Sequence, residues 1–368
     1  MRAGTHSRGR LARLAKNTLA FLLGLLLVCV PLELGLRLVL RSNDARTIVY
    51  PRVATAINGF RNGLQRQPAE DEFRILALGG SAFVTRSFQP HFERLLNESP
   101  LFRERGLRVR VISTGVPAHM SWDSLWKYRY WYRGYDFDAV LFYHGINDAR
   151  ANCYPREVFR DDYSQFPYYR QYATLFDWME RQPLLSRSFA ATLVAKLVVR
   201  AQVRLSSEVR ETGPYNDPSN DRWLDEGGDI KTEATFERNV EALLDEARAR
   251  RQPLLLLTYA FHLPPDYTNA GFRERRLDYS FAPESIPVEV WGLPHHVAKA
   301  IAAHNEVVRS VAARRPQALF FDMERHIPKS GEYFIDVCHW TDAGRQRFAD
   351  GVLQALQPYV EAGRSMQR

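Results

Sequence analysis

Five residues of the types that acyl-transfer chemistry uses each follow a short apolar run: Ser81, Gly115, Asn147, Asp336 and His339. Acyl transfer needs a nucleophile, a base with an orienting partner, and hydrogen-bond donors directed at the developing oxyanion. A serine hydroxyl, an imidazole, a carboxylate, a glycine amide and an asparagine amide supply this set. On a tight turn, the three-residue spacing of Asp336 and His339 lets the carboxylate reach one imidazole nitrogen, while the other accepts a proton from a serine.

Ser81 ends the segment FRILALGGS, in which an apolar run of β-forming residues breaks at Gly79 and Gly80. Two glycines allow a sharp turn and place the next side chain at the C-terminal edge of a sheet, where ligands bind in open α/β folds. The same residues also fit an ordinary strand-to-helix turn in which the serine caps the helix. A P-loop and a dinucleotide fingerprint are excluded, because no Lys-Ser/Thr and no third glycine follow at the required spacing.

Short apolar runs alternate with helical patterns along the chain. The runs predict strands at 73–78, 107–113, 139–143, 253–259 and 318–321. The intervening patterns predict helices at 88–97, 121–133, 232–250, 295–313 and 341–361. This alternation favours a parallel sheet covered by helices on both faces. Because the five candidate residues follow predicted strands, we expect them on one edge of that sheet.

Four blocks of the sequence resemble those of the SGNH hydrolases, also called the GDSL esterase family: GGS at 79–81, Gly115 in VISTGVP, GIND at 145–148 and DVCH at 336–339. The first block departs from the family's Gly-Asp-Ser, because Gly80 replaces an aspartate that is not a triad member. The resemblance spans about residues 73–355. It implies a three-layer α/β/α sandwich with a flavodoxin-like parallel sheet, and a serine ester hydrolase that needs no metal or organic cofactor.

By this resemblance, Ser81 is the nucleophile, His339 is the base and Asp336 orients the base. The oxyanion donors would be the backbone amides of Ser81 and Gly115 and the side chain of Asn147. An ordinary α/β-hydrolase is disfavoured, because the Gly-x-Ser-x-Gly pattern is broken and the Asp and His are close neighbours in the sequence.

Other residues beside these blocks are weaker candidates. His144 and Asp148 flank the asparagine of the third block, and they could line the pocket or fix the turn through hydrogen bonds. Trp340 follows the histidine of the fourth block and could form a pocket wall. Cys153 and Cys338 lie beside the third and fourth blocks, and in an oxidising compartment they could form a disulfide.

The net charge of +8 arises mainly from the N-terminus. Residues 1–41 hold seven Arg or Lys and one Glu, which leaves 43 basic and 41 acidic residues, a net charge of +2, in the rest of the chain. A domain this close to neutral lacks the electrostatic basis for binding nucleic acid. The hydrophobic content of 45% and the charged content of 25% are typical of a globular protein.

Residues 1–16 form a basic head. The uncharged leucine-rich run at 17–32, which extends to Leu36 if Glu33 is tolerated near the boundary, predicts a transmembrane anchor over 17–40. Five basic residues before the run, against two just after it, orient the N-terminus inward. The main domain would then be periplasmic, on a single-pass anchor in the inner (cytoplasmic) membrane of a bacterium. A cleaved signal peptide is the alternative, but no small-x-small cleavage site follows the run.

Residues 41–71 are predicted to form a linker, and 72–362 the hydrolase-like domain. This domain contains an insertion at about 149–230, which is too long for an ordinary loop and is predicted to form a cap. An apolar and basic helix at 184–205 belongs to the insertion. That helix could pack onto the domain or lie on the membrane surface.

These features together predict a membrane-anchored serine esterase that removes a small acyl group, such as acetyl, from an O-acylated glycan of the cell envelope. The prediction of a glycan substrate is based on the predicted location and on the aromatic residues of the chain. An O-acetyltransferase with the same acyl-enzyme chemistry is an alternative. A non-catalytic envelope protein that binds a glycan or an assembly partner is another. The predicted partners are an acyl ester or acylated glycan and the membrane, with no nucleic acid.

Overall fold

The computed structural model describes residues 5–40, 45–49, 64–84, 88–205 and 223–363. The chain divides into two compact units. Unit 1 comprises 1–54 and 167–211, and unit 2 comprises 55–166 and 212–368. All residues predicted to act in catalysis lie in unit 2.

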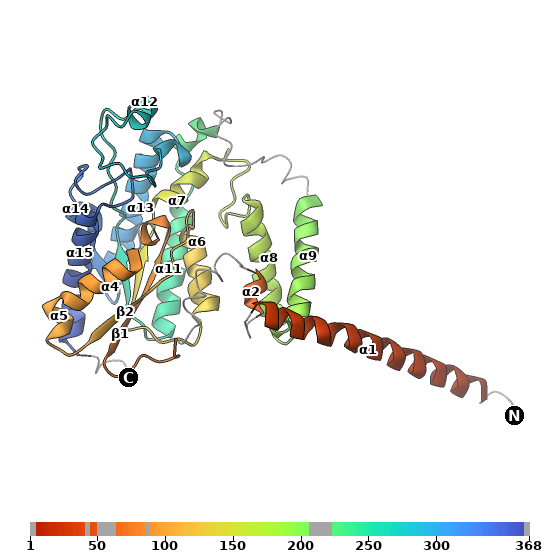
Figure 1. The fold of residues 1–368 in the computed structure, drawn as a ribbon. Coiled ribbons are helices and arrows are strands. Elements are labelled where there is room, and N and C mark those ends of the chain that lie inside the picture. Colours follow the sequence, from red (N-terminus) through yellow and green to blue (C-terminus); the bar gives the residue numbers. More distant parts are fainter. Residues whose placement is uncertain (1–4, 41–44, 50–63, 85–87, 206–222, 364–368) are drawn as a thin grey trace. The chain divides into compact units, whose positions relative to one another are not determined.

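Unit 2 is built on a five-stranded parallel sheet in the order β2-β1-β3-β4-β5 (Figure 1). The strands are β1 (Glu72–Gly79), β2 (Arg108–Ser113), β3 (Ala139–Tyr143), β4 (Leu254–Leu257) and β5 (Leu319–Phe321). This order is that of flavodoxin-like doubly wound sheets. The predicted parallel sheet is therefore confirmed, with the five strands close to their expected positions.

The burial of the strands explains why apolar runs identified them. β1, β3 and β4 are buried along their whole length, whereas the edge strands β2 and β5 are partly exposed. A strand covered on both faces needs apolar residues at every position rather than at alternate ones. Ala77 pairs with Ser113 and Gly79 with Tyr143, so the first three strands end at nearly the same level.

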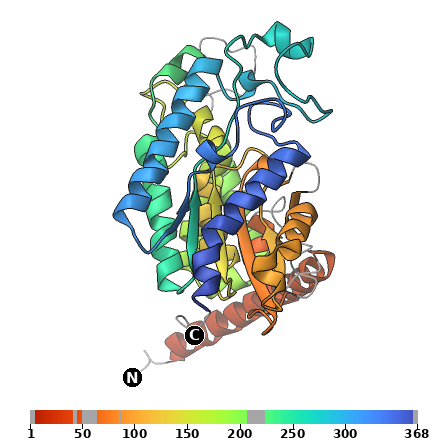
Figure 2. The same cartoon turned by 90° about the vertical axis from the view of Figure 1, so that its left-hand side faces the viewer.

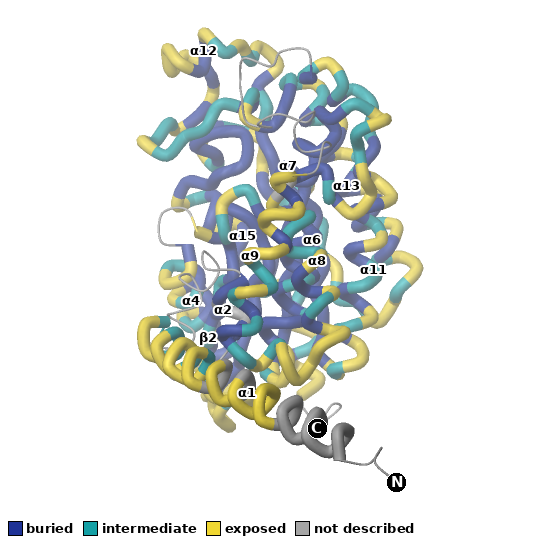
Figure 3. The backbone as a smooth tube through the Cα atoms, turned by 90° about the vertical axis from the view of Figure 1, so that its right-hand side faces the viewer, coloured by how far each residue is buried: buried dark blue, intermediate teal, exposed yellow. Residues whose placement is uncertain are grey.

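Helices cover both faces of this sheet. On one face lie α4 (Phe88–Glu98), α5 (Pro100–Arg103) and α15 (Asp342–Glu361), as Figure 2 shows for α4 and α15. On the other face lie α6 (Ser121–Trp126), α11 (Glu233–Ala249) and α13 (Pro294–Arg314). The buried residues of α13 recur every three or four positions, and its outer turns are exposed (Figure 3). The three-layer arrangement follows from this placement.

Shorter elements complete unit 2. α6 continues into a π-helical turn at Lys127–Trp131, where the sequence predicted one helix over 121–133. The remaining short helices are α7 (Ile146–Ala149), α12 (Asn269–Arg273), α14 (Met323–His326) and the 3-10 turns Ser81–Phe83, Arg150–Cys153, Asp225–Gly228 and Val288–Val290. The turn at Ser81 and α7 directly follow the C-terminal ends of β1 and β3, where the candidate residues lie.

Unit 1 contains α1 (Thr5–Leu40), α2 (Arg46–Val49), α8 (Pro167–Arg181) and α9 (Phe189–Leu205), with a 3-10 turn at Leu185–Arg187. The Glu33 side chain joins α1 to the start of α9, because it accepts hydrogen bonds of 2.9 Å from Ser188 Oγ and from Ala190 N. Arg37 forms an ion pair of 2.6 Å with Glu33. The predicted helix at 184–205 is thus observed as a turn followed by α9.

The predicted anchor over 17–40 falls within α1. In the part of the chain that the structure describes, no helix is both long enough and apolar enough to cross a membrane. The predicted span is therefore not supported. Its last turns carry Glu33, which accepts a hydrogen bond from the amide of Ala190 in α9, and Arg37, which donates one to the carbonyl oxygen of Arg187 in the preceding 3-10 turn. Parts of the basic head and of the predicted linker lie outside the described residues.

The predicted insertion at 149–230 is divided between the two units. Its helices α8 and α9 belong to unit 1, whereas residues 149–166 belong to unit 2. The polar stretch at 206–222 lies outside the described residues. The role of the insertion as a cap stays a prediction.

Candidate active site

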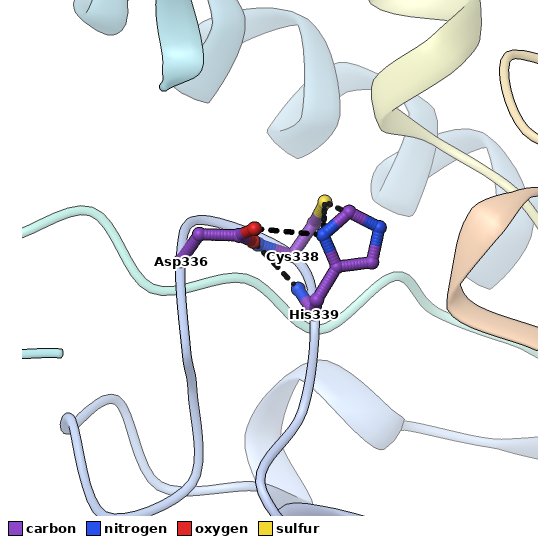
Figure 4. A group of neighbouring side chains, drawn as sticks. All are labelled: Asp336, Cys338 and His339. Atoms are coloured by element: carbon purple, nitrogen blue, oxygen red, sulfur yellow. Dashed lines mark hydrogen bonds and ion pairs between the residues drawn. The ribbon is translucent and has the colours of Figure 1, made fainter. Parts of the chain in front are cut away.

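The structure brings Ser81, His339 and Asp336 into one hydrogen-bonded chain. Ser81 Oγ lies 2.8 Å from His339 Nε2, and His339 Nδ1 lies 2.8 Å from Asp336 Oδ2. Figure 4 shows the histidine and the aspartate on one tight turn. The serine follows β1, and the other two residues lie on the loop that leads into α15. All three side chains are buried.

The backbone around Asp336 holds its carboxylate in place. Asp336 Oδ1 accepts hydrogen bonds of 2.9 Å from the amides of Cys338 and His339, and Oδ2 accepts one of 2.9 Å from the amide of Ile286. Together with His339 Nδ1, four donors surround this carboxylate. Such bonds hold the carboxylate in place and fix the face that it presents to the imidazole.

The environment of His339 favours its protonated form. Burial lowers the pKa of His339, but the neighbouring Cys338 and Asp336 act in the other direction, and the net result is a pKa well above 6.5. The carboxylate is the partner that stabilises an imidazolium here, because burial raises the pKa of the Cys338 thiol and keeps it neutral. A base held in this way is suited to accept a proton from a serine hydroxyl.

The predicted oxyanion donors gather around Gly80, the residue before the candidate nucleophile. A Cβ atom at Gly80 would lie only 2.5 Å from Asn147 Nδ2, and one at Gly115 would lie 2.7 Å from the Gly80 carbonyl oxygen. Asn147 and Gly115 therefore both approach the backbone that carries Ser81. The Gly115 amide makes a long hydrogen bond of 3.4 Å to Ser113 Oγ, which a negatively charged oxygen can replace.

Trp291, which was not among the residues predicted from the sequence, contacts two parts of the site. Its indole Nε1–H donates a hydrogen bond of 2.8 Å to Asn147 Oδ1. The centre of its ring lies 6.5 Å from that of His339. Asn147 Nδ2 in turn donates to the carbonyl oxygen of His119 at 2.9 Å. No local motif marks Trp291, because it lies 144 residues from the asparagine that it contacts.

Lys127, also not among the residues predicted from the sequence, contacts both ends of the loop between β2 and α6. Its Nζ donates a hydrogen bond of 2.7 Å to the Thr114 carbonyl oxygen and lies 3.1 Å from His119 Nδ1. Burial lowers the pKa of Lys127 to about 8. The lysine thus holds both ends of the loop that supplies Gly115.

His144 and Asp148 make hydrogen bonds inside the fold. His144 Nε2 lies 2.7 Å from Ser124 Oγ, and burial holds the pKa of this histidine well below its usual value. Asp148 accepts hydrogen bonds from the amide and hydroxyl of Ser121 and from the Tyr163 hydroxyl. Burial raises the pKa of Asp148 to about 7, although these bonds act against it. Both residues tie the edge of the sheet to α6.

Trp340, a candidate pocket wall, lies in the hydrophobic core. Its ring packs against those of Phe83, Phe88, Tyr143 and Phe348, and the residue is only 3% exposed. Among the described residues its Nε1 has no hydrogen-bond partner. Trp340 therefore supports the site from within the core.

The disulfide considered for Cys153 and Cys338 is absent from the structure, where both cysteines are free. The Cys153 sulfur is directed at the Trp291 carbonyl oxygen at 3.6 Å, and the Cys338 sulfur lies 3.7 Å from His339 Nδ1. The two cysteines lie beside sequence blocks that both contribute to the site. Their sulfur atoms nevertheless point at different partners and do not meet.

Asp336, Cys338 and His339 offer one potential metal-ligand atom each, and these atoms lie within 4.8 Å of one another. Carboxylate, thiolate and imidazole are all zinc ligands. In the arrangement observed, both nitrogens of His339 are engaged, by Asp336 and by Ser81. Binding a metal would require one of these bonds to break and the buried thiol to lose its proton.

Solved structures similar to this chain include proteins named as esterases and lipases. A GDSL-like lipase from Bacteroides thetaiotaomicron has 13% identity and a TM-score of 0.42, with 85% of this chain and 99% of that chain covered. An acetyl xylan esterase from Geobacillus stearothermophilus has 13% identity and a TM-score of 0.40, covering 79% and 97%.

A lipase/acylhydrolase from Enterococcus faecalis also has 13% identity and a TM-score of 0.40, with 78% of this chain and 96% of that chain covered. No family model and no curated protein matches the sequence. Likeness at this level does not assign a function, so the function is argued from the side chains of the site.

Proposed function

We propose that this protein is a serine esterase of the SGNH type, which cleaves carboxylic esters through an acyl-enzyme on Ser81. The observation that carries the proposal is the hydrogen-bonded chain Ser81–His339–Asp336, with the side-chain amide of Asn147 beside the residue that precedes the serine. Nucleophile, base, orienting acid and oxyanion donor are thus within reach of one reacting carbonyl.

In the acylation step, Ser81 Oγ attacks the ester carbonyl carbon while His339 Nε2 takes the hydroxyl proton. Asp336 stays ionised, accepts the Nδ1–H hydrogen bond and stabilises the imidazolium. The oxyanion receives hydrogen bonds from the amides of Ser81 and Gly115 and from Asn147 Nδ2. His339 then protonates the leaving alcohol, the carbon–oxygen bond of the ester breaks, and the acyl group stays on the serine.

In the deacylation step, His339 takes a proton from a water molecule that attacks the acyl-enzyme. The second tetrahedral intermediate uses the same oxyanion donors. Its collapse breaks the bond to Ser81 Oγ, which receives the proton from His339, and the carboxylic acid leaves. An acceptor hydroxyl in place of water would turn the same cycle into acyl transfer.

We propose short acyl esters of a cell-envelope glycan as the substrate class and the periplasm as the location. The charge asymmetry around residues 17–40 and the aromatic content support this part of the proposal, which is independent of the chemistry. Release of acetate from acetylated glycan by the purified protein tests the substrate. Protease added to intact spheroplasts tests the location, because a cytoplasmic domain would be protected.

The chemistry is tested by fluorophosphonate labelling and by turnover of p-nitrophenyl acetate. Ser81→Ala should abolish both. Ser124→Ala is the matched control, because Ser124 is also a buried serine, 2.7 Å from a histidine nitrogen. No carboxylate lies within ion-pair distance of that histidine, His144, in the described part of the chain, and it should not activate a nucleophile. Labelling that persists in Ser81→Ala, or wild-type protein that neither labels nor turns over ester, would contradict the proposal.

A further inference from the structure

One loop segment, Ile286–Gly292, contacts both halves of the proposed catalytic machinery. At its start, the Ile286 amide donates a hydrogen bond of 2.9 Å to Asp336 Oδ2. Near its end, the Trp291 indole Nε1–H donates one of 2.8 Å to Asn147 Oδ1. The segment therefore touches the acid that orients the base and the side chain that would stabilise the oxyanion.

An asparagine side chain serves as an oxyanion donor in only one of its two orientations. Its oxygen and its nitrogen occupy nearly the same space, so shape alone does not distinguish the correct orientation from the flipped one. In the flipped orientation a partial negative charge would face the oxyanion and oppose the reaction. The side chain of Asn147 must therefore be oriented by partners that recognise oxygen and nitrogen separately.

The two partners of Asn147 do this. An indole N–H can only donate, so only Oδ1 is able to face Trp291. A backbone carbonyl can only accept, so only Nδ2 is able to face His119, at 2.9 Å. Both contacts select the same orientation. They leave the second N–H of Nδ2 beside Gly80, against which this nitrogen packs closely.

We propose that Trp291 is a positioning residue that orients the Asn147 amide as an oxyanion donor. The inference rests on the proposed function, because it assigns a role within the same reaction. Trp291 is only 4% exposed, so water does not readily replace its N–H. Without that donor, Asn147 Oδ1 loses a buried partner and the flipped orientation becomes accessible.

The test is a double-mutant cycle that combines Trp291→Phe with Asn147→Ala. Trp291→Phe keeps an aromatic ring but removes the donor, and it should lower kcat about 10-fold to 100-fold with little change in KM. In the Asn147→Ala background the same change should cost less than about 2-fold, because the group that it orients is absent. Trp340→Phe measures the effect of shrinking a buried indole that has no hydrogen bond to lose.

Equal losses of kcat from Trp291→Phe in both backgrounds would overturn the inference, since the tryptophan would then act through packing alone. Full activity of the single variant would also overturn it. If Trp291→Phe does not fold, as judged by its thermal midpoint, Trp291→Met provides a flexible apolar side chain that also lacks a hydrogen-bond donor. A wild-type protein without Ser81-dependent activity would instead reject the proposed function, which is a separate outcome.

Discussion

Gly80→Ala is a small substitution that should have a large effect on activity. The backbone at Gly80 has φ −95° and ψ −142°, so its φ is negative and a left-handed conformation is not the reason for the glycine. The reason is space, because an added Cβ would lie 2.5 Å from Asn147 Nδ2 and 3.3 Å from the His119 carbonyl oxygen. One of these groups must move.

The size of the movement follows from the contact distances. Ordinary contact begins at 3.4 Å, so Asn147 Nδ2 must retreat by 0.9 Å from its present 2.5 Å. Asn147 Nδ2 donates a hydrogen bond of 2.9 Å to the His119 carbonyl oxygen, and Asn147 Oδ1 accepts one of 2.8 Å from Trp291; we expect the displacement to break at least one of them. Loss of an oxyanion donor costs about 3 kcal/mol, and we expect kcat to fall by about 100-fold. The broken buried hydrogen bond should also lower the free energy of unfolding by about 1–3 kcal/mol.

The assay is steady-state turnover of a short-chain ester, with the thermal midpoint as a measure of folding. Gly227→Ala is the matched control. Gly227 also lies in unit 2, and the nearest atom to a Cβ added there would be 3.4 Å away. We expect this control to keep wild-type kcat. Wild-type kcat in a folded Gly80→Ala protein would refute the reasoning, since the asparagine amide could then move without consequence. An equal loss in an Asn147→Ala background would also refute it.

Three further predictions concern protonation and redox state. Because only neutral imidazole accepts a proton, kcat/KM should rise with pH through the raised pKa of His339, and the midpoint of this rise should lie above pH 6.5. Asp336→Asn should move that midpoint to lower pH and reduce kcat by about 10⁴-fold, and an unchanged midpoint would contradict the assignment. The pKa of Lys127 is about 8 in the folded protein and 10.5 in the unfolded chain. Between these values the unfolded chain binds more protons, so the wild type should gain about 3 kcal/mol of stability relative to Lys127→Met as pH rises, measured by urea unfolding at pH 8 and 10.5. Reductant should leave the thermal midpoint unchanged, because Cys153 and Cys338 are free; a drop of several degrees would indicate a disulfide.

The sheet and the shared edge of the candidate residues were predictable because they depend on local pattern and on one rule of topology. Apolar runs of four or five residues mark β1, β3 and β4, which are buried on both faces. Parallel strands all end at the same edge, so residues that follow them meet whatever their separation in the sequence. Ser81 and His339, which are 258 residues apart, meet in this way.

The partners of the site were less predictable, because they depend on the direction of individual side chains. Asp148 directly follows Asn147, yet its carboxylate turns toward Ser121 and Tyr163. Trp291 lies on a loop with no repeating pattern, and its contact with Asn147 spans 144 residues. Sequence spacing places a residue at an edge, but the packing of neighbouring loops decides which way its side chain points.

The departure of Gly80 from the family pattern has a physical explanation in this fold. An aspartate at this position would carry a Cβ only 2.5 Å from Asn147 Nδ2. The missing side chain of Gly80 leaves the space in which the Asn147 amide packs against the backbone. The close approach is maintained by the Trp291 donor and the His119 acceptor, which hold the amide against Gly80. Gly80→Asp should therefore displace the Asn147 amide, as we expect for Gly80→Ala, and lower kcat to a similar extent.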